Sequence, residues 1–242
     1  MGPSRAGAEL PRRLGALAAS LGEGLLDTLF PPRCVDCGEL LQPPERLFCE
    51  ACRASLEELP LPHSATAGAG EPVPIITWAI YGGAVERSIV RLKFGGEPWL
   101  AEALVREAFP RLRPALVAFG PEQVLPVPLH PSRLRRRGYN QAARLARPLA
   151  AALQVPLDQS SLQRIRPTPP QTTLDGEQRR TNLRDAFQAA SAQVAGRRLL
   201  LVDDVITTGS TVAECARALD AAGARAVAVC ALARTLPERS GP

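Results

Sequence analysis

Two carboxylates and a group of hydroxyl side chains follow one another in the last quarter of the chain. Asp203 and Asp204 end a run of apolar residues, and the next polar turn consists of Thr207, Thr208, Gly209, Ser210 and Thr211. Backbone N–H groups of such a turn, where a helix begins, can hold a phosphate dianion. Adjacent carboxylates can accept hydrogen bonds from the two vicinal hydroxyls of a ribose. Because a plain strand-to-helix turn needs only one capping residue, the pattern predicts a site for a ribose 5′-phosphate.

Four cysteines form two CxxC pairs near the start of the sequence: Cys34, Cys37, Cys49 and Cys52. Two such pairs can bring four thiolates to one tetrahedral zinc ion, and four protein ligands leave no open position, so the zinc would be structural. Two disulfides are an alternative, but we find no secretory signal, and cytosolic thiols stay reduced. A redox role for one CxxC is a second alternative, which two motifs in one short stretch disfavour.

The elements that must position these residues alternate between strands and helices. Apolar runs predict strands at residues 75–81, 123–127, 199–202 and 226–232, and helical spacing predicts helices at 85–94, 100–119, 139–153 and 210–222. This alternation is typical of an α/β fold, a parallel sheet that helices cover on both faces. Ligands of such sheets bind at the carboxyl ends of the strands, where the acidic pair is expected.

The remaining segments suggest three parts along the chain. Leucines at helical spacing predict an N-terminal amphipathic helix within residues 1–32, and residues 33–58 hold the predicted zinc ribbon. Residues 72–236 hold the α/β domain. Between them, residues 59–74 are rich in Pro, Gly, Ala and Ser, which predicts a linker or an ordered crossover.

The composition excludes a protein embedded in a membrane and permits an anionic partner. No apolar run approaches the length of a membrane span, so we expect a cytoplasmic protein without membrane insertion. The net charge is +5 and the pI is near 9.2, and Lys93 is the only lysine among the basic residues. Such a balance allows a polyanionic partner without requiring one.

Several motifs resemble those of known families. The run 199–211 resembles the signature that binds 5-phosphoribosyl-1-pyrophosphate (PRPP) in type I phosphoribosyltransferases, a hydrophobic strand followed by an acidic pair and TTGST. Residues 124–141, which contain VLPVPLHP and RRRGYNQ, resemble a segment of the bacterial ComF family, as do the cysteines and the residues around Lys93. This resemblance covers residues 25–235 and implies a zinc ribbon joined to a type I phosphoribosyltransferase-like domain.

The resemblance implies roles for the site residues. Asp203 and Asp204 would be the catalytic residues, anchoring the ribose of PRPP, and Mg²⁺ would bind together with PRPP. Arg136 and Arg137 follow a strand at the position where these enzymes hold pyrophosphate, and guanidinium forks match phosphate oxygens. Lys93 is a further pyrophosphate candidate. The alternatives are a solvated basic turn or a nucleic-acid patch for the arginines and a surface role for the lysine.

Two functions of different classes stay open at this stage. ComF relatives accompany an ATP-driven DNA translocase in natural transformation, so the resemblance implies a protein that binds PRPP or a related nucleotide and acts in DNA uptake. Its candidate partners are a DNA translocase or helicase and single-stranded DNA. The alternative is an active phosphoribosyltransferase that transfers phosphoribose to a nitrogenous base in nucleotide salvage. In that case the polar segment 164–184, with Gln171 and Arg180, would cover the reacting carbon.

Overall fold

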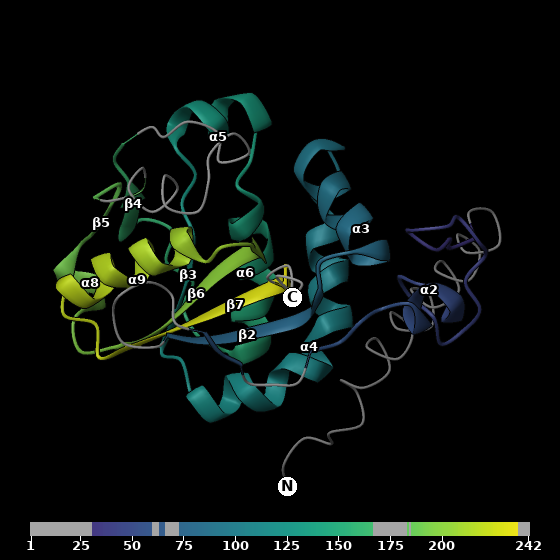
Figure 1. Cartoon of the computed structure of the whole chain (residues 1–242), viewed down its shortest axis with the longest axis horizontal. Coiled ribbons are helices and arrows are strands. Elements are labelled where there is room, and N and C mark those ends of the chain that lie inside the picture. The colour runs from purple at the N-terminus through teal and green to yellow at the C-terminus, as the bar shows by residue number, and fades with distance from the viewer. Residues whose placement is uncertain (1–30, 60–62, 66–72, 167–182, 184, 237–242) are drawn as a thin grey trace, which may run out of the picture. The chain divides into compact units, whose positions relative to one another are not determined.

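The computed structural model describes residues 31–59, 63–65, 73–166, 183 and 185–236 (Figure 1). Contacts divide the chain into two compact units, residues 1–53 and 54–242, and each unit is considered by itself. The predicted N-terminal helix falls almost wholly on residues outside the described part. So do Gln171 and Arg180 of the segment expected to cover the site. Within the described residues, no helix has the length and apolar character needed to cross a membrane.

The first unit is built from tight turns around a small core. Arg33 and Leu40 form an antiparallel bridge, and the N–H of Cys34 donates to the carbonyl of Glu39 at 2.7 Å. Phe48 is fully buried, and the single helix described here, α2, spans Glu50–Ala54. Within residues 31–53 the buried apolar side chains are few, and a module with so small a described core is stabilised by a cross-link or a metal.

The second unit is organised around a five-stranded sheet with the order β1-β2-β7-β6-β3. Four strands are parallel, and β1 pairs antiparallel with β2 at one edge. The strands are β1 (His63–Ala65), β2 (Val73–Ile80), β3 (Gln123–Pro126), β6 (Arg198–Ile206) and β7 (Ala226–Arg234). The predicted parallel sheet is therefore confirmed, and its carboxyl edge carries the acidic pair.

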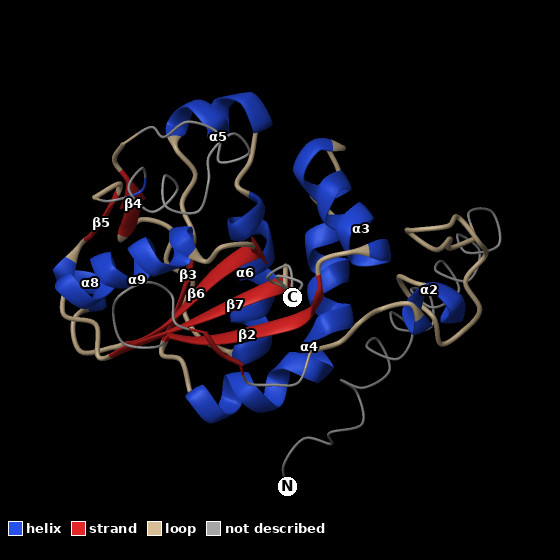
Figure 2. Cartoon of the chain, in the orientation of Figure 1, coloured by secondary structure: helices blue, strands red, loops and turns tan. Residues whose placement is uncertain are grey.

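Helices cover both faces of this sheet (Figure 2). The principal helices are α3 (Gly83–Phe94), α4 (Leu100–Phe119), α6 (Gln141–Leu153) and α9 (Ser210–Ala221). Leu201 of β6 belongs to a buried cluster with Leu219 of α9. The next residue, Val202, lines a small internal space together with Leu112 of α4 and Leu149 of α6. Successive strand residues face opposite sides, so α9 covers one face and α4 with α6 cover the other.

Three features differ from the elements predicted by the sequence. First, β6 continues to Ile206, because Asp203, Val205 and Ile206 still pair with β7. Second, the basic segment is itself a short helix, α5 (Pro131–Arg137), and α6 begins only at Gln141. Third, β1 and a separate two-stranded sheet were not predicted. The small sheet pairs β4 (Leu162–Arg164) with β5 (Phe187–Ala189), which precedes the short helix α8 (Ser191–Val194).

Local chemistry explains why the basic segment is helical. Pro131 occupies the first turn, where its fixed φ suits a helix and its missing N–H costs nothing. His130 caps the start, accepting a hydrogen bond from the N–H of Ser132 at 3.3 Å. Gly138 ends the helix in the left-handed conformation, with φ of 82°. The arginines therefore lie on a helix and not on the basic turn that the sequence analysis considered.

Candidate functional site

The acidic pair lies near the carboxyl end of β6, and its two members meet different neighbours. Asp203 lies within electrostatic range of Arg164 on β4 and of Cys215 on α9. Burial and the negative charge of Asp204 raise the pKa of the Asp203 carboxyl well above its usual value. Asp204 is buried, with 3% of its surface exposed. Asp203 therefore holds a proton more tightly than an ordinary aspartic acid does.

Lys93 lies at the end of α3 and is paired with the buried acid. Its Nζ lies 2.8 Å from Oδ2 of Asp204, and the lysine side chain is only 21% exposed. The sequence placed Lys93 beside a pyrophosphate, and the structure brings it to the acidic pair instead of a solvated surface. A compact ammonium suits this position, because a buried carboxylate needs a nearby cation.

The hydroxyl-rich turn connects β6 to the start of α9. Gly209 adopts the left-handed conformation with φ of 75° and directly precedes the first residue of the helix. The hydroxyls of Thr208 and Ser210 lie 2.9 Å apart, while Thr207 and Thr208 are exposed. α9 spans 12 residues, so its N-terminus carries a full helix dipole that favours an anion. The five residues predicted to hold phosphate, Thr207 to Thr211, lie together in this turn and the first two positions of α9.

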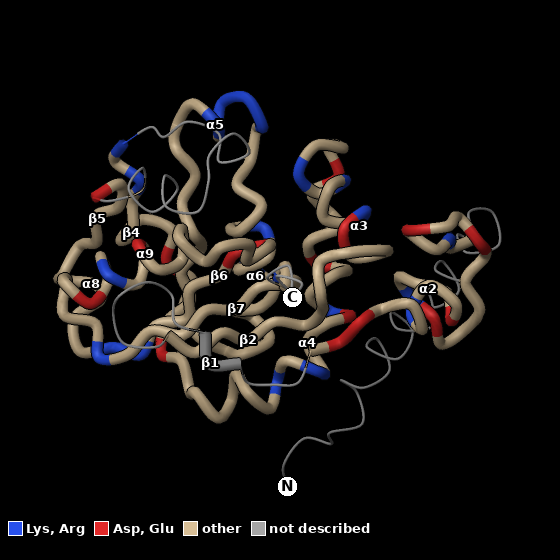
Figure 3. The backbone as a smooth tube through the Cα atoms, viewed as in Figure 1, with Lys and Arg blue, Asp and Glu red and all other residues tan. Residues whose placement is uncertain are grey.

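The arginines of α5 form a concentrated positive charge on the second unit (Figure 3). Arg136 is exposed, and Arg137 is half-buried. Arg137 donates to Oε1 of Gln141 at 2.5 Å, and its guanidinium lies 4.9 Å from the centre of the Phe94 ring. Because Phe94 follows Lys93 directly, the end of α3 contacts both the basic helix and the acidic pair.

A second contact fixes α3 to the chain that follows α5. The hydroxyl of Tyr139 donates to the carbonyl of Leu92. Asn140, the next residue, caps α6 by accepting from the N–H of Ala142 at 3.0 Å. The packing role of Tyr139 could not be read from its motif, because its partner lies 47 positions earlier in the chain.

Two more residues near the acidic pair were missed by the sequence analysis. Tyr81 follows β2, and burial together with the charges of Glu86 and Asp204 raises its pKa. Arg164 lies on β4, with its guanidinium 5.3 Å from the ring centre of Phe187 on β5. Burial and the charge of Arg133 lower the pKa of Arg164, and Asp203 opposes this effect. For Tyr81 the only available signal was its place at the end of the predicted strand 75–81, whereas β4, which carries Arg164, was not predicted.

The four cysteines of the first unit converge on one point. Their sulfur atoms all lie within 4.8 Å of one another, and Sγ of Cys37 lies 3.6 Å from Sγ of Cys49. Zn–S bonds of about 2.3 Å place tetrahedral sulfurs about 3.8 Å apart, so this donor set fits a zinc ion. Gly38, with φ of 77°, closes the first CxxC turn by donating to the carbonyl of Cys34 at 2.9 Å. Four thiols in a closed set support structural zinc and not a catalytic metal.

The surroundings of the cluster shift the pKa values of its thiols in different directions. Burial opposes ionisation of Cys34, but backbone hydrogen bonds from Cys37, Cys49 and Asp36 lower the pKa of its thiol to about 7. Burial and a hydrogen bond to Asp36, with Sγ at 3.1 Å from Oδ2, raise the pKa of Cys52. Cys215 and Cys230 are buried in the second unit, outside the cluster.

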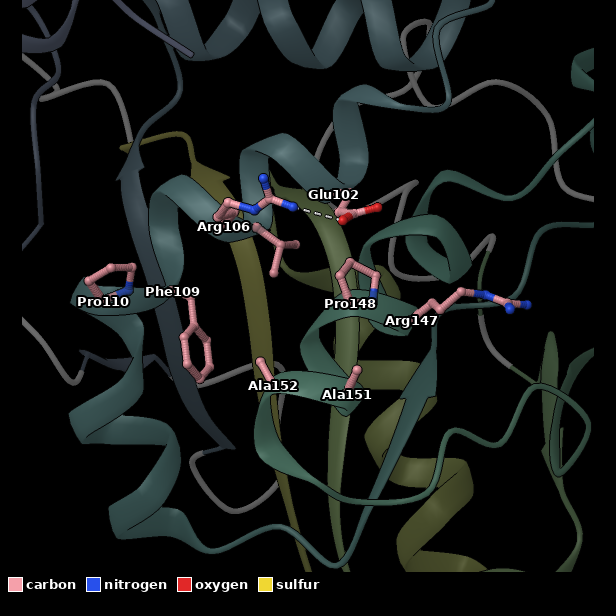
Figure 4. Close-up of a pocket in the computed structure, with 9 residues that line it drawn as sticks. Glu102, Arg106, Phe109, Pro110, Arg147, Pro148, Ala151 and Ala152 are labelled. Carbon is pink, nitrogen blue, oxygen red and sulfur yellow. Dashed lines mark hydrogen bonds and ion pairs between the residues drawn. The ribbon is translucent and has the colours of Figure 1, made fainter. Parts of the chain in front are cut away.

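A hollow between α4 and α6 does not coincide with any of these groups. It measures about 480 Å³ and is lined largely by apolar side chains, among them Phe109, Pro148 and Ala151 (Figure 4). A phosphorylated sugar needs polar and cationic partners. We therefore place the candidate site at the end of β6, where the charges and the turn converge, and not in this hollow.

Comparisons with known proteins agree with both units. Residues 136–240 match the phosphoribosyl transferase domain, and residues 25–74 match the double zinc ribbon domain. Competence protein F of Haemophilus influenzae is 32% identical over 228 residues, which cover 85% of this chain and 98% of that protein. The DNA utilization protein YhgH of Escherichia coli O157:H7 is 39% identical over 165 residues, covering 67% of this chain and 72% of that protein.

Proposed function

This chain belongs to the family of competence protein F and the DNA utilization protein YhgH, and we propose that its phosphoribosyltransferase domain binds PRPP or a related nucleotide in a DNA-uptake role. One observation supports this most: β6 leads through an acidic pair and a left-handed Gly209 directly into the N-terminus of α9. That arrangement offers carboxylates to a sugar diol and backbone N–H groups to its phosphate.

The proposed ligand occupies the carboxyl edge of the sheet. Asp203 and Asp204 accept hydrogen bonds from the ribose hydroxyls, and the turn from Thr207 to Thr211 holds the 5′-phosphate. Arg136 and Arg137 neutralise the pyrophosphate, because guanidinium forks match two phosphate oxygens at once. Mg²⁺ binds together with PRPP at the same edge and offsets the charge of the pyrophosphate.

Lys93 has two roles in this proposal. Without ligand, its ammonium compensates Asp204, as the 2.8 Å distance indicates. With PRPP bound, the ribose hydroxyls hydrogen-bond the carboxylate, and the ammonium turns toward the pyrophosphate. The exchange replaces one partner of the buried acid by another, so the carboxylate is never left without a polar contact.

The names of the relatives, competence protein F and DNA utilization protein YhgH, support a role in DNA uptake. We propose a cytoplasmic protein that acts with a DNA translocase or helicase, with single-stranded DNA as a further candidate partner. We propose that the zinc ribbon contacts the protein partner. Its four thiols leave no open metal position, so its role is structural and not catalytic.

Calorimetric titration of PRPP with Mg²⁺ tests the binding site. Wild type is expected to bind, and Asp203→Asn/Asp204→Asn is expected to lose binding. The matched control is Glu57→Gln/Glu102→Gln, which removes two exposed carboxylates of the same unit. Circular dichroism verifies that each variant is folded. Equal affinity of wild type and the aspartate variant would reject the proposed site.

Two further measurements separate the roles open to a PRPP-binding protein. Release of pyrophosphate from PRPP with a panel of nitrogenous bases would identify an active transferase, whereas tight binding without release fits the DNA-uptake role. Binding of single-stranded DNA that weakens with salt, and that is lost when Arg135, Arg136 and Arg137 are changed to Gln, would assign the basic helix to nucleic acid.

A further inference from the structure

A second hollow of the same unit is lined by residues of the edge strand β3, of α5 and of α6. It measures about 420 Å³, within the range of small-molecule sites. Polar and apolar side chains both line it, among them Pro128, Leu134, Asn140, Arg144, Arg147 and Gln159. None of the residues proposed to hold PRPP lines it, although its wall includes Leu134 and Gly138, which flank Arg136 and Arg137 of the proposed pyrophosphate site.

Two guanidiniums supply the charge of this hollow. Arg144 and Arg147 are exposed and stand three residues apart on α6, so their side chains leave the helix on the same side. Neither forms an ion pair with a described residue, and none of the described residues that line the hollow is a carboxylate. The guanidinium of Arg144 lies 5.8 Å from the centre of the Tyr139 ring. Arg147 extends away from the apolar hollow between α4 and α6 (Figure 4).

The walls of the hollow are held in place by hydrogen bonds. Asn140 donates to the carbonyl of Val127 at 3.0 Å while it caps α6, which fixes one part of the wall. The chain beside Gln159 is fixed to β3, since the N–H of Asp158 donates to the carbonyl of Val124 at 2.9 Å. The Asp158 carboxylate accepts from Ser160 and Ser161 in its own turn and from Nε2 of Gln123 on β3 at 2.7 Å, so both of its oxygens are engaged. The hollow is therefore preformed and has an uncompensated charge from two arginines.

We propose that this hollow binds a nucleoside phosphate. Two guanidiniums side by side match the oxygens of a phosphate group. The proline and leucine walls cover the apolar faces of a sugar or a base, and the amide of Gln159 offers both a donor and an acceptor to a base edge. A nucleotide is the ligand class that carries a dianion, a sugar and a flat polar-edged ring together.

The nucleoside phosphate can come from two sources, a free nucleotide or one unit of a single-stranded nucleic acid. Both present the same phosphate to Arg144 and Arg147. The inference stands independently of PRPP binding, because the two sites share no residue. For this reason the test is carried out on the full chain with PRPP and Mg²⁺ present in saturating amount.

The experiment measures binding of adenosine monophosphate and of a short single-stranded oligonucleotide by equilibrium dialysis. We expect at least one of them to bind, and we expect Arg144→Gln/Arg147→Gln to weaken that binding at least about tenfold. A hydrogen bond to a charged group contributes at least about 1.4 kcal/mol, which corresponds to a factor of about ten. For the oligonucleotide, the slope of log affinity against log salt should fall by about 0.7, because the variant no longer neutralises the one phosphate that both arginines hold.

Arg106→Gln/Arg113→Gln is the matched control, because it removes two exposed arginines of α4 and should leave binding unchanged. Binding of the mononucleotide alone would identify a free nucleotide as the source, and binding of the oligonucleotide alone would identify a strand. Adenosine without phosphate should not bind. The inference is overturned if neither probe binds, if the α4 and α6 variants behave alike, or if inorganic phosphate binds as tightly as the nucleotide.

Discussion

Lys93 and Asp204 form an ion pair between the end of α3 and the end of β6, with Nζ 2.8 Å from Oδ2. The acid is 4% exposed in its side chain and the lysine 21%, so both charges are largely removed from water. Such a pair gives little net stability compared with apolar residues, but breaking it by removing one partner is costly. Lys93, the only lysine of the chain, thus pairs with a residue that we propose binds the ribose.

Lys93→Met should destabilise the protein by about 3 kcal/mol, because removing one partner of a buried ion pair leaves the other without compensation. Urea unfolding measures the loss. Arg106→Met removes an exposed pair with Glu102 and should cost only about 0.5 kcal/mol. A loss for Lys93→Met as small as that for Arg106→Met would contradict the explanation.

Asp203→Asn should stabilise the protein at neutral pH while it abolishes PRPP binding. The pKa of Asp203 is raised in the folded state by burial and by Asp204, so the folded state binds this proton more tightly than the unfolded state does. Stability therefore falls as the pH rises through the ordinary carboxyl range toward the raised pKa. The melting temperature should rise by about 2–4 °C for each kcal/mol gained, and the gain should vanish near about pH 4.

Asp158→Asn should change the stability of the protein in the opposite direction to Asp203→Asn. Burial opposes ionisation of Asp158, but hydrogen bonds from Ser161 and Ser160 outweigh it and lower the pKa of this carboxyl. Its contribution to stability is present above the ordinary carboxyl range and is lost as the pH falls through the lowered value. The variant should therefore melt at a lower temperature than wild type at neutral pH. Equal shifts for the two variants would be inconsistent with these environments.

Gly209→Ala should reduce stability by about 1–2 kcal/mol, the cost of a side chain in the left-handed region. The nearest side-chain atom to an added Cβ is Cγ2 of Ile206 at 4.0 Å, so strain and not a clash is responsible. PRPP affinity should fall as well, because the turn is displaced. Gly82→Ala is the control: its φ of 172° is extended and its surroundings are open. Similar losses for both variants would count against this account of the turn.

Cys34→Ser should abolish stoichiometric zinc binding, measured by atomic absorption on the purified chain, because it removes one of four converging thiols. Chelation of wild-type protein should make the four thiols reactive and should lower the stability of the first unit, whose core is small. Cys230→Ser alters a buried cysteine of the second unit and should retain the zinc. Retention of zinc by the Cys34 variant would refute the four-thiolate site.

Local sequence patterns predicted the main elements because each depends mostly on neighbours in the chain. The apolar runs became β2, β3, β6 and β7, whose buried faces require such residues. The spacing of the cysteines predicted their convergence, since each CxxC is a tight turn that sets two sulfurs close together. In contrast, β1, β4 and β5 have three residues each, too few for a periodic pattern to distinguish them from a loop.

The α/β class, the zinc ribbon and the order of acidic pair, turn and helix could be predicted from residue type and spacing within short segments. The packing of the elements was needed to show that Lys93 compensates Asp204, that Phe94 and Tyr139 connect α3 to the basic helix, and that Arg144 and Arg147 line a second hollow. These relationships join residues from different elements, and their geometry depends on how the helices pack on the sheet, which local spacing does not encode.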